Sequence, residues 1–180
     1  MKFVHIKDIA KFNSNNLSST TFKGGCVSYL DTGNLTNGKV SSYQHIDLSE
    51  SKLPSRAKRL VKQNSILYST VRPNQRHFGI IDANNVPENL VVSTGFTVID
   101  VNSDVADPYF VYYFLQQEKI IKKLTALAEQ NVSAYPSIKA SDIGELLMPL
   151  PNIRQQRQSI QILKYIDEKI RINEQINDNL

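Results

Sequence analysis

The stretch "MPLPNIRQQRQSIQILKYIDEKI", residues 148–170, decides the architecture, because it joins two prolines to a long helical pattern. Pro149 and Pro151 lack a backbone N–H and interrupt regular hydrogen bonding. From Asn152 the pattern continues to Leu180, a length of roughly 43 Å at about 1.5 Å per residue. We therefore expect a domain over residues 1–148, followed by a proline hinge and a spacer or dimerisation helix over 149–180.

The helical segment carries a seam of the coiled-coil type, with three- and four-residue steps in alternation. The seam consists of Leu163, Ile166, Ile170, Asn173, Asn177 and Leu180, and a second stripe of Ile162, Tyr165, Lys169, Ile172 and Ile176 lies beside it. Two apolar stripes predict an interface with more than one helix or with one broad partner. The asparagines would fix the register, because a misaligned amide would be buried without a partner. A helix folded back on its own domain is the alternative, which the length and the prolines disfavour.

The residues before the hinge alternate between short apolar runs and turn formers. Strands are expected at 26–30, 43–48, 65–73, 77–82 and 90–101. Asn37-Gly38 predicts a tight turn, and Gly95 predicts a bulge or a close backbone approach. Asp107-Pro108 predicts the start of one helix that covers the sheet, with Phe110, Phe114, Ile121, Leu124 and Ala128 at helical spacing. Many short strands and one covering helix predict an α+β fold.

The bulk composition limits where the chain works. It has 180 residues, enough for one domain with an appendage or for two very small domains. No apolar run approaches the ~20 residues that span a bilayer, and the charged N-terminus does not resemble a signal peptide. The single cysteine, Cys26, excludes an intrachain disulfide and suits a reducing compartment. We therefore expect a cytoplasmic protein without a membrane partner.

Positive charge is concentrated in one window, from Ser51 to Ile81. The window contains no Asp or Glu, and its basic residues are Lys52, Arg56, Lys58, Arg59, Lys62, Arg72 and Arg76. A field of one sign attracts polyanions, above all nucleic acid. The alternative is a solvated face that keeps the protein soluble, although such faces usually mix both signs.

Two groups of side chains within this window suit different parts of DNA, and one further candidate lies after it. Arg72, Asn74, Gln75, Arg76 and His77 lie in one turn and can pair with base edges. The cations that suit phosphates better are Arg56, Lys58, Arg59 and Lys62. Tyr135, in "NVSAYP" (131–136), is a further candidate for contacting DNA, and a packed aromatic residue is the equally weighted alternative.

No catalytic, metal or cofactor site is predicted. The sequence has no Gly-rich phosphate loop, and one cysteine with three scattered histidines does not predict zinc. "DPYF" (107–110) is similar to the tetrapeptide of amino-methyltransferases, but it lacks the second proline and is explained by a helix start. A DNA-cleaving or DNA-modifying enzyme with an unrecognised active site remains the alternative to a DNA-binding module.

Four stretches in order resemble one half of the DNA-specificity subunit of type I restriction-modification systems. They are "VSYLDTGNLTNG" (27–38), "NSILYSTVRPNQRHFGI" (64–80), "VVSTGFTVI" (91–99) and "YPSIKASDIGELLMPLPNIRQQRQSIQILKYIDEKIRINEQINDNL" (135–180). The resemblance implies a target-recognition domain that reads half of a bipartite site in double-stranded DNA and has no catalysis of its own. It also implies that the helix docks methyltransferase subunits, which use S-adenosylmethionine, and that a restriction subunit completes the complex.

The chain departs from the family pattern at two points. Gln155-Gln156 stands where the family usually has Glu-Gln, which weakens any contact assigned to that Glu. Only one recognition domain is present. The resemblance therefore implies either a half-length subunit that pairs with a second copy, or a piece of a longer protein whose second recognition domain supplies the partner helix.

Overall fold

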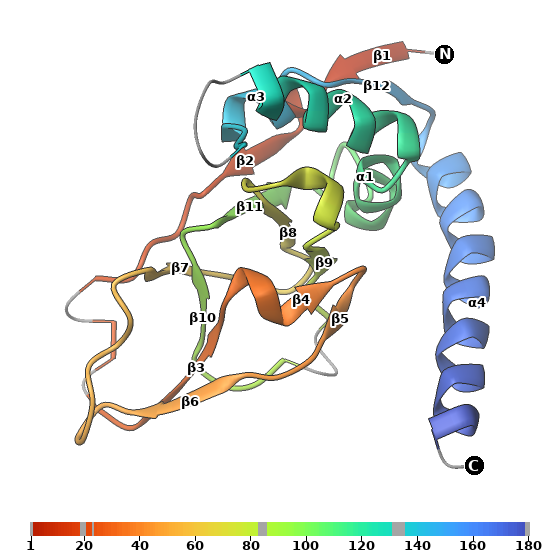
Figure 1. Ribbon diagram of the computed structural model, residues 1–180. Helices are drawn as coiled ribbons and strands as arrows, with labels where there is room; N and C mark the ends of the chain where they lie inside the picture. The colour runs from red at the N-terminus through yellow and green to blue at the C-terminus, as the bar shows by residue number, and fades with distance from the viewer. Residues whose placement is uncertain (1, 19–20, 23, 83–85, 131–135, 179–180) are drawn as a thin grey trace.

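The computed structural model describes residues 2–18, 21–22, 24–82, 86–130 and 136–178. It shows a mixed domain of strands and short helices, with one long helix running down its side (Figure 1). The expected α+β class and the helix that ends the chain are therefore confirmed.

Two four-stranded sheets form the centre of the domain. The first has the order β6 (Gln44–Asp47), β3 (Cys26–Leu30), β10 (Leu90–Ser93) and β7 (Ala57–Leu60). The second has the order β2 (Ala10–Phe12), β11 (Phe96–Val101), β8 (Ile66–Ser69) and β9 (Phe78–Ile80). Only the β3–β10 pairing in these two sheets is parallel. The strand expected at 26–30 is present with those bounds, and the strands expected at 43–48, 65–73 and 77–82 are present with shorter bounds.

Two smaller strand pairs connect distant or neighbouring segments. β1 (Lys2–His5) pairs with β12 (Leu147–Leu150), which places Pro149 opposite Phe3. β4 (Leu35–Thr36) and β5 (Lys39–Val40) form a hairpin whose turn residues, Asn37 and Gly38, have φ of 48° and 78°. The predicted tight turn is confirmed. Pro149 thus lies in a strand, and the chain enters its last helix after Pro151.

The single strand expected over 90–101 is wrong, because β10 and β11 belong to different sheets. The chain turns between them: Thr94 N donates to Arg56 O (2.8 Å), and Gly95 O accepts from Thr70 N (2.9 Å). The Arg56 guanidinium lies so close to Gly95 that a Cβ there would collide with it. The predicted close backbone approach at Gly95 is therefore confirmed, while strand continuity is not.

The single covering helix is also wrong, since the segment divides into α1 (Pro108–Leu115) and α2 (Glu118–Gln130). Val111 and Leu115 are buried in α1, and an unbroken helix would next turn Lys119 inward. The interruption instead brings Ile120 and Ile121 to the core. The start at Asp107 is confirmed, because its carboxylate accepts from Tyr109 N at 3.0 Å.

The helices cover one sheet, and the two sheets share a second core. Tyr68 of β8 stacks on Phe78 of β9 at 5.6 Å between ring centroids, and Tyr112 of α1 meets Phe78 edge-on. A short helix, α3 (Ala140–Gly144), adds Ile143 to the same cluster. The second cluster joins side chains from both sheets, namely Leu30, Leu67, Val92 and Phe96 with their neighbours.

The last helix, α4 (Ile153–Asp178), starts at a reciprocal cap. Gln155 N donates to the Asn152 side chain at 3.0 Å, and Asn152 N donates to the Gln155 side chain at 3.3 Å, which satisfies two backbone groups that the helix end leaves open. The predicted start near Asn152 is confirmed. α4 packs against α1 and extends beside the domain (Figure 1). Among the described residues, no helix combines the length and apolar character needed to cross a membrane.

Candidate nucleic-acid interface

Residues 72–77, called the reading loop below, join β8 to β9 and contain the short helix η3 (Pro73–Gln75). Arg72 and Arg76 flank η3, and both have left-handed backbones, with φ of 48° and 57°. That conformation costs on the order of 1–3 kcal/mol for a non-glycine residue, so it persists only where neighbouring structure enforces it. Asn74 and Gln75 are exposed at the turn between them.

Arg76 and His77, which are predicted to read bases, are held by contacts within the protein. Arg76 Nη2 lies 2.5 Å from Glu118 Oε2 at the start of α2. His77 Nδ1 lies 2.7 Å from the carbonyl oxygen of Leu35 in β4. The side chains of Arg72, Asn74 and Gln75 are exposed, so the loop presents one guanidinium and two amides to the outside.

Residues 136–138 lie against the reading loop. Arg72 N donates to Pro136 O at 3.0 Å, and Ile138 N donates to Thr70 O at 2.8 Å. Tyr135 lies outside the described residues, so its predicted DNA contact stays a prediction. The backbone contacts nevertheless bring the end of the 131–136 segment beside the loop, although the two are far apart in sequence.

Arg56 is exposed immediately before β7, and its guanidinium lies against Gly95. Partial burial alone would raise the pKa of the nearby Asp31. Hydrogen bonds from Thr32 N and the Ser93 hydroxyl, together with the charge of Arg56, outweigh it and lower that pKa. The Arg56 guanidinium thus lies beside the Gly95 backbone, and its charge contributes to the lowered pKa of Asp31.

The other three predicted phosphate contacts differ in their surroundings. Lys58 is exposed on β7, the edge strand of its sheet. Burial lowers the pKa of Arg59, whose Nε is buried without a hydrogen-bond partner among the described residues. Lys62 Nζ lies 3.9 Å from a carboxylate oxygen of the buried Asp100. Lys58 is thus the cation of this group most open to a polyanion.

The basic residues and the reading loop are fastened to the same turn. In the Thr94–Gly95 turn, Gly95 O accepts a hydrogen bond from Thr70 N, and Thr94 N donates one to Arg56 O. The start of β7 and the entry to the reading loop therefore flank one point of the fold.

The described residues of the predicted helix seam, which exclude Leu180, belong to a continuous exposed surface on α4. Its large apolar side chains are called the outer face below; they are Ile162, Leu163, Tyr165, Ile166, Ile170, Ile172 and Ile176, each at least 36% exposed. Asn173 and Asn177 are also exposed. Contiguous exposed apolar surface of this kind is typical of interaction sites, so the predicted helix interface stays a prediction.

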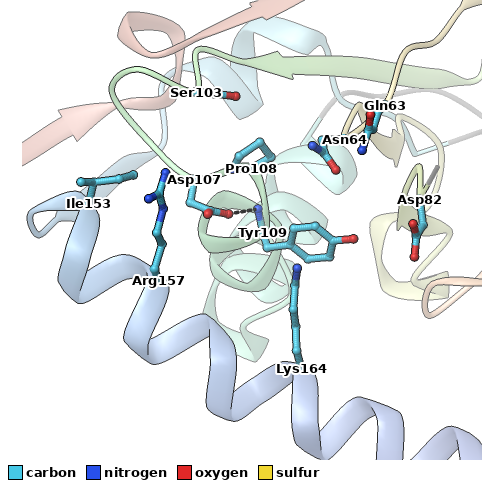
Figure 2. A pocket seen from close by; sticks show the side chains of 10 residues that line it. All are labelled: Gln63, Asn64, Asp82, Ser103, Asp107, Pro108, Tyr109, Ile153, Arg157 and Lys164. Carbon is cyan, nitrogen blue, oxygen red and sulfur yellow. Dashed lines mark hydrogen bonds between the residues drawn. The ribbon is translucent and has the colours of Figure 1, made fainter. Parts of the chain in front are cut away.

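A hollow of about 480 Å³ lies where the start of α4 meets α1. Figure 2 shows Arg157 and Lys164 pointing into it from α4, with Asp107 and Tyr109 beside them and Asp82 opposite. Opposite charges are mixed along its walls. Nowhere in the described ranges do three or more His, Cys, Asp or Glu side chains gather in a way that could hold a metal ion.

Sequence reasoning missed the residues that hold α4 to the domain. Gln156 is fully buried and bridges Asp107 N (2.9 Å) to Pro151 O (2.8 Å). Asp167 accepts from the Tyr113 hydroxyl at 2.7 Å. The available signal was the spacing of Gln156, Ile160, Asp167 and Glu174, which follows one side of a helix.

Comparison with known proteins identifies a family that matches the whole chain and relatives that match most of it. Residues 1–180 match the family described as the type I restriction modification DNA specificity domain. The type I restriction enzyme HindI specificity subunit of Haemophilus influenzae is 32% identical over 155 residues, which are 86% of this chain and 33% of that protein. The chain therefore spans about a third of the length of that relative.

Solved structures show the same fold. The HsdS subunit from Thermoanaerobacter tengcongensis aligns with a TM-score of 0.79 at 21% identity, over 97% of this chain and 44% of that chain. A chain from a study of complex assembly and conformational transition of the type I R-M system also gives 0.79, at 23% identity and the same coverage. Both are more than twice as long as the part that aligns.

Proposed function

The chain belongs to the family of type I restriction-modification DNA specificity domains, and we propose that it reads one half of a bipartite site in double-stranded DNA. The match of all 180 residues to that family carries the proposal. The exposed side chains of Arg72, Asn74 and Gln75 support it, because arginine pairs with guanine and side-chain amides pair with adenine. Arg56 and Lys58 would contact phosphates of the DNA backbone near the bases that are read.

A second recognition domain would read the other half of the site. Its helix would pack on the outer face of α4, and it would come from a second copy of this chain or from a longer protein that contains both. The two half-sites would lie about one turn of DNA apart, roughly 34–36 Å. If two identical copies pair antiparallel, their two-fold symmetry predicts a split palindrome.

The proposed assembly includes methyltransferase subunits docked on the helices and a restriction subunit that completes the complex. The chain itself would bring no catalysis. The boundary between the recognition domain (1–148) and the hinge with its helix (149–180) stays a proposal.

Sequencing of methylated DNA from cells that express this chain with its methyltransferase partner tests the proposal. We expect methylation at a bipartite motif with a fixed spacer, and no such motif without the chain. A contiguous motif, or methylation unchanged by the chain, would contradict half-site reading.

A second assay tests the absence of catalysis. The purified chain is incubated with DNA, magnesium and S-adenosylmethionine, and strand cleavage and methyl transfer are measured. We expect neither. Turnover that follows the chain through purification would support the enzyme alternative.

A further inference from the structure

The apolar part of the contact between α4 and its own domain is confined to the start of the helix. Gln156 and Ile160 are buried there, at 0% and 4% exposure. From Gln161 onward every side chain that the structure describes is exposed or only partly buried. The remainder of α4, about 27 Å at about 1.5 Å per residue, is therefore a lever that a small rotation at its base would swing.

Three polar contacts hold this lever, all on the side of α4 that carries Ile160. Lys164 Nζ lies 3.2 Å from the ring centroid of Tyr109 in α1. The Tyr113 hydroxyl donates to Asp167. Near the end of the helix, Glu174 forms an ion pair with Lys39 of the β4–β5 hairpin. The contacts follow one another along the helix, so each limits tilt at a different distance from the base.

The hairpin that carries Lys39 is itself fixed to the reading loop. Asn37 N donates to Arg76 O at 2.9 Å, and Gly38 N donates to Phe78 O at 2.8 Å. Leu35 packs so closely on Gly79 that a Cβ there would lie 2.9 Å from Leu35 Cδ1. The hairpin thus connects the loop that is proposed to meet DNA to the far part of the helix.

We propose that Tyr113, Lys39, Asp167 and Glu174 form a brace that sets the angle between the recognition domain and α4, and so the spacing of the two half-sites. The inference rests on the proposed function. A rotation of about 10° over a lever of about 27 Å moves its end by about 5 Å. One base pair rises about 3.4 Å, so a smaller tilt already shifts the second domain by one base pair.

Distance measurement between two spin labels tests the brace without DNA. One label is placed on Cys26, the only cysteine, and the other on Gln175→Cys near the end of α4, with unlabelled chain in excess. We expect a narrow distribution that broadens or shifts by several ångströms in Tyr113→Phe/Glu174→Gln. The control, Glu168→Gln, removes the same charge from α4 at a residue that pairs with Arg171 of the same helix, and it should not move the distribution.

Unchanged mean and width in the Tyr113→Phe/Glu174→Gln chain would overturn the brace. The second readout is affinity of the paired assembly for DNA whose half-sites are one base pair closer or farther apart. The affinity of the wild-type assembly should fall about tenfold on such DNA, which is the scale of one mismatched base pair. The affinity of the brace variant should fall clearly less. Equal losses of affinity in the two proteins would also overturn the proposal. If neither protein distinguishes specific from random DNA, half-site reading fails, and the label distances still decide the brace.

Discussion

The reading loop and the outer face of α4 are both exposed, but they suit opposite kinds of partner. The loop presents a guanidinium and two amides, with Arg76 and His77 tied back by Glu118 and Leu35. The outer face presents isoleucines, a leucine and a tyrosine, with Lys169, Asn173 and Asn177 among them. A hydrated, negatively charged surface suits the first, and a dry helix suits the second.

The difference extends to how each surface is built. The outer face comes from one continuous helix, so its geometry follows from sequence spacing alone. The reading surface combines segments that are distant in sequence: Arg56 rests on Gly95, and Arg72 is joined to Pro136. Substitutions should therefore affect pairing and DNA reading separately, except where one residue joins the two regions.

The largest expected effect comes from placing charge on the outer face. Ile166→Asp/Ile170→Asp replaces two side chains that are 51% and 49% exposed in the isolated chain. Pairing should weaken at least about a thousandfold, because burying an unpaired charge costs several kcal/mol. Light scattering measures the association, while circular dichroism and half-site affinity should stay at wild-type values.

The control for that variant is Gln161→Asp/Gln175→Asp, which adds the same charges on the polar flank of α4. It should pair like the wild type. Equal loss in both variants would mean that net charge, and not the outer face, governs pairing. A wild-type chain that stays monomeric at high concentration would rule out the second copy and leave the second domain of a longer protein.

A smaller effect is expected at Gln156, which joins α4 to the rest of the fold. Gln156→Ala leaves Asp107 N and Pro151 O without their buried partner, and each unsatisfied group costs about 1–3 kcal/mol. The free energy of unfolding in urea should fall by about 2–4 kcal/mol. Gln155→Ala, which removes an exposed cap contact, should cost less, and an equal loss would contradict this role for Gln156.

The sequence predicted those parts of the fold that depend on local pattern. The start of α4 at Asn152, the Asn37-Gly38 turn and the cap at Asp107 were predicted correctly, because each rests on residues a few positions apart. The exposed apolar seam of α4 also followed from spacing. Gly95 was identified as a point of close approach, although the partner that approaches it could not be named.

The remaining features depend on contacts that no local pattern contains. The turn after β10 exists because Arg56 and Thr70 bind its backbone, so a run of strand formers was mistaken for one strand. The break between α1 and α2 shifts the buried face from Leu115 to Ile120. Counting apolar residues at helical spacing over the whole segment does not reveal this shift. Glu118 and Asp100 lie outside the basic window but reach its cations.

Arg72 should affect DNA reading and leave pairing unchanged. Arg72→Ala removes the exposed guanidinium of the reading loop, which should cost about 1–3 kcal/mol and relax the preference at one base position. Binding to a library with each half-site position randomised measures this. Arg154→Ala, an exposed arginine at the start of α4, is the control; uniform weakening over all sequences would assign Arg72 to the phosphates.

The smallest expected effect is at Lys58, and salt makes it measurable. Lys58 is exposed on edge strand β7, so Lys58→Ala should weaken all DNA sequences alike and flatten the log-log salt dependence by roughly 0.9. Pairing through the outer face buries apolar groups and releases no condensed counterions, so added salt should not weaken it. One salt titration that follows both DNA affinity and association state therefore separates the two surfaces. A Lys58→Ala chain whose affinity keeps the wild-type salt slope would mean that this lysine only keeps the protein soluble.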